Sequence, residues 1–425
     1  RAACVCRTRR GAMTISLSSP ATSSALRSAP NFRSWQRDTF ERGLLPVIGI
    51  AGGRGKSTVV RMLDEILRKA HLRTATWTNL GIDIRGKRQR GEISGWSLAL
   101  SRLSESSIDV AIQELDWSTI NAVGLPPSSY PLLAVSNLAG SLDAPLGEEF
   151  TLTARRGAHR VAVAVHTDGV LVVSGDDPGL VESANFADCT LAVTSLSHES
   201  PNLRRHFEHG GSGVWIDDGN VRSGDFSDFR SLCAEADIRS GLGGAAPFEL
   251  ANALTAIAIA SCVGVDDETI AQAICAFDTT ADILPGSFNV YAVGEYRVVV
   301  DGAAPSWHLR PLLRAANPGN RRRQISVIGN LERLPEHDLP EIGRLLGRHQ
   351  GAIVLHSSTR KDLTERFKRG IAANDFPPVV IHLPTERRAL NRALKTARAD
   401  DLVLILTDGD PGPSSRAVGR LLAPD

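Results

Sequence analysis

One short run of the chain carries the residue types that bind a nucleoside triphosphate. It reads Gly52-Gly53-Arg54-Gly55-Lys56-Ser57-Thr58. Glycines allow backbone N–H groups to close around phosphate oxygens, and a helix that begins there adds partial positive charge. The Lys56 ammonium would neutralise the outer phosphates, and the hydroxyl of Ser57 or Thr58 would bind Mg2+. The run therefore predicts a phosphate-binding loop.

The segments on either side of this run have the pattern that a phosphate-binding loop requires. Residues 44–51 (LLPVIGIA) predict an apolar strand. After the loop, apolar residues recur at helical spacing: Val59, Met62, Leu63, Ile66 and Leu67. Ile50 departs from the strict consensus, which has its first glycine there. A chance glycine-rich turn is the alternative, and the correct flanks favour nucleotide binding.

The composition is that of an ordinary globular protein. The chain has 425 residues, 42% hydrophobic and 22% charged, so two or three domains are expected. A net charge of +1 argues against a surface that binds nucleic acid over the whole molecule. No apolar run approaches membrane-spanning length, and the six cysteines lack zinc-ligand spacing. We therefore expect a cytoplasmic protein that binds neither nucleic acid nor membrane.

The N-terminal segment differs in composition from the rest of the chain. Residues 1–37 contain no Asp or Glu and are rich in Arg and Ser. An organelle transit peptide has this composition, but the chain begins with Arg, and Met13 is a candidate start. We expect residues 1–39 to be a disordered tail or part of an over-extended reading frame.

Strands and helices alternate through the remaining sequence, as in a parallel sheet covered by helices. We expect an α/β protein with a central P-loop ATP-binding domain over residues 40–283 and a C-terminal Rossmann-like domain over 284–425. The central domain has predicted strands at 109–115, 132–137, 161–165, 170–173 and 190–193, an irregular excursion or small β insertion at 199–240, and a buried helix at 248–263. The C-terminal domain has a predicted hairpin at 289–293 and 296–301, strands at 324–329, 352–356, 379–383 and 402–407, and helices at 339–349 and 385–397.

The loop and several later segments resemble the Mur ligase family. The run from Ile50 to Thr58 looks like the phosphate loop of these enzymes, and later segments are similar to the Mur-ligase-like C-terminal half of cyanophycin synthetase. These segments are Gly95–Ser97, Asp109–Glu114, Gly175–Pro178, Pro247–Leu254 and Leu284–Asn289. Their order and spacing extend the resemblance over about residues 45–420.

The resemblance implies an ATP-dependent ligase that forms amides. Such enzymes activate a carboxylate as an acyl phosphate, from which an amine then displaces phosphate. It also implies catalytic roles for Lys56 and Glu114, Mg2+ bound by Ser57 and Glu114, and nucleotide contacts from the loop, from Asn252 on the adenine side and from Asp301. Two alternatives stay open: Glu114 could be a solvated carboxylate at a strand end, and Asn252 a satisfied core amide.

Several polar positions of the family pattern are changed in this chain. Where the family has an Asp-His pair, residues 137–143 read NLAGSLD. The run that begins at Asp301 also lacks its histidine, and Ser287 takes the place of a usual arginine. The family's carbamylated lysine, which orders a second metal ion, has no counterpart, because no lysine lies between Lys87 and Lys361.

These changes suggest altered chemistry or lost catalysis. Arg155 and Arg156 lie near the position of the missing lysine, and a guanidinium cannot form the same carbamate ligand. Asp116 or Asp143 could fill in for the lost ligands in a one-metal site, since each follows a predicted strand end. The alternative, that both are ordinary loop aspartates that cap helices or turns, is more common.

Three functions are compatible with these features. The first is a ligase that uses ATP and Mg2+ to join an amino-acid or peptide amine to an amino-acid, peptide or polymer carboxylate. The second is a degenerate, non-catalytic nucleotide-binding homologue that partners a true ligase, and the third is a P-loop kinase or NTP hydrolase. The intact loop favours the first, the missing ligands favour the second, and the second α/β domain argues against the third. A UDP-sugar acceptor is not expected, because the loop begins only about fifty residues into the sequence. A homo-oligomer or a partner ligase subunit is left open.

Overall fold

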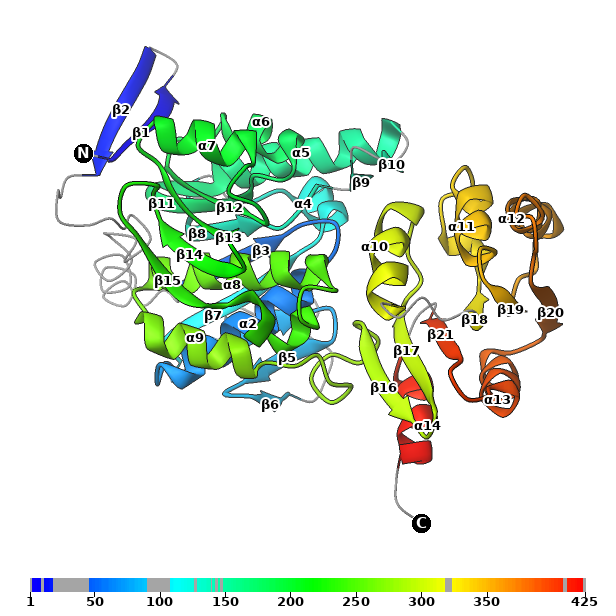
Figure 1. The fold of residues 1–425 in the computed structure, drawn as a ribbon. Coiled ribbons are helices and arrows are strands. Elements are labelled where there is room, and N and C mark those ends of the chain that lie inside the picture. The colour runs from blue at the N-terminus through cyan, green and yellow to red at the C-terminus, as the bar shows by residue number, and fades with distance from the viewer. Residues whose placement is uncertain are drawn as a thin grey trace. The chain divides into compact units, whose positions relative to one another are not determined.

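The chain folds into two compact units (Figure 1). The first consists of Arg1–Ser141 and Pro145–Phe277, and the second mainly of Asp278–Asp425. The sequence predicts this boundary between residues 283 and 284. The structure, a computed structural model, describes residues 2–8, 11–17, 46–89, 108–125, 128–138, 140–141, 144–145, 148–317, 323–407 and 411–422.

An 11-stranded sheet is the framework of the first unit. Its order is β15-β14-β13-β12-β11-β8-β3-β7-β4-β5-β6. The parallel centre consists of β3 (Val47–Ala51), β4 (Thr74–Thr78), β7 (Val110–Leu115), β8 (Tyr130–Val135), β11 (Val165–Ser174), β12 (Thr190–Ser195) and β13 (Ser212–Asp217). Antiparallel strands complete the two edges: β5 (Gly81–Ile84), β6 (Lys87–Arg88), β14 (Asn220–Gly224) and β15 (Phe229–Ala234).

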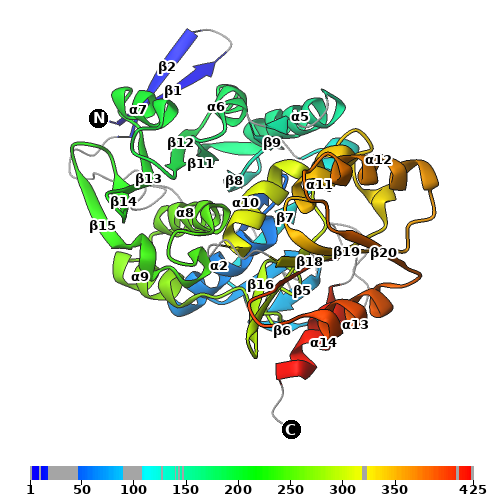
Figure 2. The same cartoon turned by 45° about the vertical axis from the view of Figure 1, so that its right-hand side comes forward.

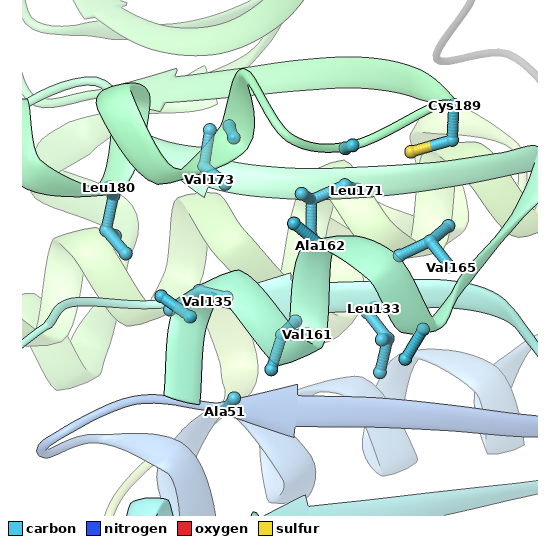
Figure 3. Close-up of a cluster of buried hydrophobic side chains, with 14 of the residues drawn as sticks. Ala51, Leu133, Val135, Val161, Ala162, Val165, Leu171, Val173, Leu180 and Cys189 are labelled. Carbon is cyan, nitrogen blue, oxygen red and sulfur yellow. The ribbon is translucent and has the colours of Figure 1, made fainter. Parts of the chain in front are cut away.

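Helices cover both faces of this sheet (Figures 1 and 2). One face carries α2 (Lys56–Lys69), α8 (Pro247–Val263) and α9 (Asp267–Ala276). The other carries α4 (Trp117–Val123), α5 (Glu148–Ala164), α6 (Pro178–Ala184) and α7 (Pro201–Glu208). Because both faces are covered, the central strands are buried along nearly their whole length rather than on alternate residues, and every residue of β8 is buried. Figure 3 shows Val161 and Ala162 of α5 among the side chains of β8 and β11, in one buried cluster.

Two segments of the first unit differ from the prediction. Residues 161–165, predicted as a strand, form the end of α5 and the first residue of β11. The alternation of Val and Ala resembled a strand, but Val161 and Ala162 are both buried while Val163 is 43% exposed, as on one side of a helix. In the segment 199–240, the predicted β insertion is confirmed as β13 to β15, but α7 was missed. This helix is only 8 residues long, and its apolar signal consists of Leu203 and Phe207, both buried.

The second unit is a six-stranded sheet of order β16-β17-β21-β18-β19-β20. The predicted hairpin is formed by β16 (Asn289–Val293) and β17 (Tyr296–Gly302), and the parallel strands are β17, β18 (Arg323–Gly329), β19 (Gln350–His356), β20 (Val379–Leu383) and β21 (Leu402–Thr407). One face carries α10 (Ser306–Ala316), α11 (Leu339–Leu346) and α12 (Lys361–Ala372), and the other α13 (Glu386–Thr396) and α14 (Gly412–Leu422). The Rossmann-like α/β arrangement predicted for this part of the chain is confirmed.

Two short hairpin-like pairs complete the description. β1 (Ala2–Thr8) pairs antiparallel with β2 (Gly11–Leu17), and β9 (Gly140–Ser141) pairs with β10 (Ala144–Pro145). The expectation of a disordered or mis-annotated tail over residues 1–39 stays a prediction. Within the described ranges, the helices are all too short or too polar to cross a membrane.

Candidate nucleotide-binding site

The glycine-rich run forms the turn between β3 and α2, as the sequence predicts. Lys56 is the first residue of α2, and Gly52 and Gly55 have φ angles of +147° and +83°, which favour glycine. A Cβ atom at Gly55 would lie 2.2 Å from Asn252 Oδ1, so this position has no room for a side chain. The N–H groups of a helix's first turn have no acceptor within the helix. The start of α2 therefore presents backbone donors and the positive end of the helix dipole to an anion.

Two residues that follow β8 hold this loop in shape. Asn137 Oδ1 accepts hydrogen bonds from the N–H groups of Gly53 and Arg54, both at 3.1 Å. Asn137 Nδ2 donates to Arg54 O at 2.9 Å, and Ser136 Oγ donates to the same carbonyl at 3.0 Å. β8 is the neighbour of β3 in the sheet, so these residues arrive beside the loop through strand pairing. The loop is thereby anchored to the sheet edge instead of being held by its own glycines alone.

Three polar side chains converge on the other side of the loop. The Ser57 hydroxyl donates to Glu114 Oε2 at 2.7 Å, and Lys56 Nζ lies 3.7 Å from Glu114 Oε1. Lys56 Nζ lies closer to Asp116 Oδ1, at 3.1 Å. Glu114 belongs to β7, the neighbour of β3 opposite to β8, and its partner in the register is Ile50. Lys56, Ser57 and Glu114 thus meet at the carboxyl ends of adjacent parallel strands. This end of the strands is where α/β sheets bind ligands.

The Ser57–Glu114 pair fits a magnesium ion. Both side chains offer oxygen, the donor atom that Mg2+ prefers. Their oxygens are 2.7 Å apart, close to the spacing of about 3 Å between neighbouring ligands that each lie about 2.1 Å from the ion in an octahedron. The Glu114 side chain is only 5% exposed, which argues against the alternative of a merely solvated strand end. Their role as metal ligands stays a prediction.

Asn252 reaches the loop from α8, which packs against α2 on the same face of the sheet. Its Oδ1 packs against Gly55, and its Nδ2 lies 3.5 Å from Glu249 Oε2, one turn earlier in the helix. Asn252 and Glu249 are both buried. The resemblance predicts an adenine contact for Asn252 and assigns no role to Glu249. The structure brings Asn252 to the phosphate loop, and the adenine contact itself stays a prediction.

The remaining predicted site residue, Asp301, belongs to the second unit, at the end of β17. Its carboxylate accepts from Gly302 N–H at 2.6 Å and lies 3.8 Å from His308 Nε2. Both Asp301 and His308 are buried. The sequence run lacks the family's histidine at its usual position, and α10 supplies a different histidine beside the same aspartate. The nucleotide contact predicted for Asp301 stays a prediction.

The structure also bears on the two aspartates considered as replacement metal ligands. Asp116 takes the N-cap position of α4, but its side chain makes no capping hydrogen bond and pairs with Lys56 instead. Asp143 and the Gly95–Ser97 segment lie outside the described residues. Asn137 was the functional residue that sequence reasoning missed: it stood within the altered Asp-His motif, and only the pairing of β8 with β3 shows its contact with the loop.

Comparison with known proteins relates the chain to a family of ligases. No family model matches the chain. Cyanophycin synthetase of Synechocystis sp. is 24% identical over 385 residues, which cover 86% of this chain and 42% of that protein. A UDP-N-acetylmuramoyl-L-alanyl-D-glutamate–2,6-diaminopimelate ligase of Aquifex aeolicus is 22% identical over 383 residues, covering 86% and 72%. The chain is a relative of the Mur ligases. It spans less than half the length of the cyanophycin synthetase.

The fold is shared with solved ligase structures. A bifunctional folylpolyglutamate synthase/dihydrofolate synthase from Yersinia pestis, complexed with AMPPNP and a Mn ion, has a TM-score of 0.62 at 15% identity. The match covers 96% of this chain and 95% of that one. The similarity confirms the α/β fold class that the sequence predicted.

Proposed function

We propose that this Mur ligase relative is an ATP-dependent ligase that forms an amide from a carboxylate and an amine through an acyl phosphate. The carboxylate would belong to an amino acid, a peptide or an amino-acid polymer, and the amine to an amino acid or peptide. The convergence of the glycine loop, Lys56 and the Ser57–Glu114 pair at one sheet edge carries this proposal. The relationship to cyanophycin synthetases and to a Mur-type ligase supports amide formation over a kinase or hydrolase activity.

The reaction needs a site that gathers negative charge. A carboxylate oxygen attacks the γ-phosphorus of ATP and ADP leaves; the amine then attacks the acyl carbon and phosphate leaves. The loop amides and the Lys56 ammonium would bind the phosphates and stabilise charge on the transferring group. A Mg2+ ion held by the Ser57 and Glu114 oxygens would neutralise further phosphate charge. Asn137 would keep the loop amides oriented before the nucleotide arrives.

The second candidate function is a nucleotide-binding homologue that supports a true ligase without catalysing the reaction. One observation favours it: Arg155, near the position of the missing lysine, forms an exposed ion pair with Glu182 on α6, 3.8 Å away. A guanidinium engaged there supplies no carbamate ligand. Cys189, Cys233, Cys262 and Cys275 are free thiols, which suits a reducing compartment, and we propose the cytoplasm for either function.

Phosphate release decides between these functions. The protein is incubated with ATP and Mg2+ and a panel of amino acids and peptides, and both released phosphate and new amide products are measured. Release that depends on an amine and yields an amide supports the ligase. Binding of ATP without turnover in any mixture supports the partner function, and release that needs no added substrate supports a hydrolase.

Two lysines of the same helix provide the matched control. Lys56→Ala removes the buried ammonium at the loop, whereas Lys69→Ala removes an exposed one at the far end of α2. We expect Lys56→Ala to weaken ATP binding at least tenfold and Lys69→Ala to leave it unchanged. Equal effects of the two substitutions would contradict the assignment of Lys56.

A further inference from the structure

Two carboxylates, and not one, face the ammonium of the phosphate loop. Lys56 Nζ lies 3.1 Å from Asp116 Oδ1 and 3.7 Å from Glu114 Oε1. The side chains of Lys56 and Glu114 are 10% and 5% exposed, whereas that of Asp116 is 50% exposed. Before any nucleotide enters, the formal charge of this group is therefore negative. An incoming triphosphate adds more negative charge and needs the same ammonium.

The position of Asp116 is fixed by its neighbours rather than by helix capping. An aspartate at an N-cap normally accepts a hydrogen bond from the first turn of its helix, but Asp116 makes none. The next residue, Trp117, donates from its indole N–H to Leu138 O at 2.8 Å, and its ring fills the space beside Gly157 of α5. The start of α4 is thereby held, and the Asp116 carboxylate is directed to Lys56.

The two carboxylates differ in how easily they can leave the lysine. Glu114 is buried and accepts a hydrogen bond from Ser57, and it also lies 3.4 Å from Asn79 N–H. Asp116 is half exposed, so water can solvate its carboxylate once it turns away from Lys56. Glu114 is therefore held in place beside Lys56, whereas the Asp116 carboxylate can exchange its contact with Lys56 for contact with water.

We propose that Asp116 is a positioning residue for Lys56 that competes with the nucleotide phosphates for its ammonium. In the absence of nucleotide, Asp116 holds Lys56 at the loop, and it releases the lysine when the triphosphate binds. The inference rests on the proposed function, because it requires a triphosphate at the loop. It assigns to Asp116 a role different from metal ligation and from helix capping.

The competition predicts that ATP affinity rises, rather than falls, when Asp116 is replaced. A residue that merely supports the site weakens binding when it is replaced, whereas removal of a competitor tightens binding. A half-exposed ion pair is worth up to about 1 kcal/mol, so we expect Asp116→Asn to tighten the binding of metal-free ATP by about three- to fivefold. Asp116→Glu keeps the charge and should bind ATP within about twofold of the wild type, the range that a modest pair strength allows.

Calorimetry with ATP in excess EDTA and with Mg-ATP tests the proposal. The matched control is Asp168→Asn, which removes the same charge at an exposed position near the amino end of β11. The loop lies at the carboxyl ends of the parallel strands, so Asp168 is at the other end of the strands. The proposal is supported if Asp116→Asn binds metal-free ATP more tightly than the wild type does and Asp168→Asn does not. Asp116→Asn must also bind Mg-ATP at least as tightly as the wild type. Equal affinities of the two variants overturn it. A tenfold loss of Mg-ATP affinity in Asp116→Asn also overturns it, in favour of a metal ligand.

The failure of this inference can be told apart from the failure of the proposed function. If the wild-type protein binds no ATP in either condition, the nucleotide site itself is refuted. If the wild type binds ATP and Asp116→Asn changes nothing, only the competition is refuted. Urea unfolding of both variants shows whether the fold is intact.

Discussion

The contact between Gly55 and Asn252 allows a quantitative test of how the phosphate loop is packed. Gly55 has a φ of +83°, and a Cβ there would lie 2.2 Å from Asn252 Oδ1. Gly55→Ala therefore incurs two separate costs. The left-handed backbone costs a residue with a side chain about 1–2 kcal/mol. The overlap with a buried amide adds about 1–3 kcal/mol.

A double-mutant cycle separates the two costs. In the Asn252→Ala background the overlap is gone, so Gly55→Ala should then cost only the backbone term of about 1–2 kcal/mol. We therefore expect a coupling free energy of about 1–3 kcal/mol between the two positions, equal to the overlap cost and well above the limit of about 0.5 kcal/mol for independent sites. Gly55→Ala should also weaken ATP binding, because the displaced loop no longer directs its amides at the phosphates.

The assay is urea unfolding of the wild type, both single variants and the double variant, followed by tryptophan fluorescence. Five of the six tryptophans precede residue 278, so the signal reports mainly on the first unit. Gly219→Ala is the matched control, because Gly219 has a φ of +67° and no atom within 4 Å of the added Cβ. If Gly55→Ala costs no more than Gly219→Ala, or if the cycle is additive, Asn252 does not pack on the loop.

Two further substitutions test the site and the fold. Asn137→Ala removes the acceptor for the Gly53 and Arg54 amides and should weaken ATP binding by about tenfold, worth about 1.4 kcal/mol. Calorimetry measures this loss, with Asn202→Ala, which removes an amide outside the loop, as the control. Equal losses in the two variants would refute the anchoring role of Asn137. Burial of His206 lowers its pKa to about 4, below the ordinary value of about 6.5 in the unfolded chain. The unfolded state therefore binds a proton more readily, and the free energy of unfolding falls as the pH falls below about 6.5. His206→Asn should remove about 2 kcal/mol of the fall in this free energy between pH 8 and pH 5, as measured by urea unfolding. An unchanged decline in that variant would show that another group dominates it.

The strand–loop–helix unit at residues 47–69 could be predicted from the sequence because its signals are local. Apolar runs, glycines and helical spacing all lie within one short stretch. Glu114 was named through the resemblance of its strand to the Mur ligases. The contacts of Asn137 could not be predicted in this way. They join residues 83 and 84 positions apart, and they depend on which strand pairs with β3.

The errors in secondary structure have a related cause. Residues 161–165 alternate between Val and Ala, a pattern that suits a half-buried strand. In the fold they end a helix that packs on the sheet, and tertiary burial decided the outcome rather than the alternation. The helix α7 was missed because two buried residues, Leu203 and Phe207, are too few for a periodic signal.

The chain keeps some polar groups of the family pattern and lacks others. Lys56 and Glu114 are almost fully buried, and burial of charged side chains is unfavourable unless they are paired. Here Lys56 pairs with Glu114 and, at shorter distance, with Asp116, and Glu114 also accepts a hydrogen bond from Ser57. The sequence also lacks several polar groups of the family pattern, and the resemblance implies that one of them, the carbamylated lysine, orders a second metal ion. ATP binding is therefore expected of both candidate functions, and it cannot separate them. Only release of phosphate that depends on an amine distinguishes a ligase from a nucleotide-binding partner.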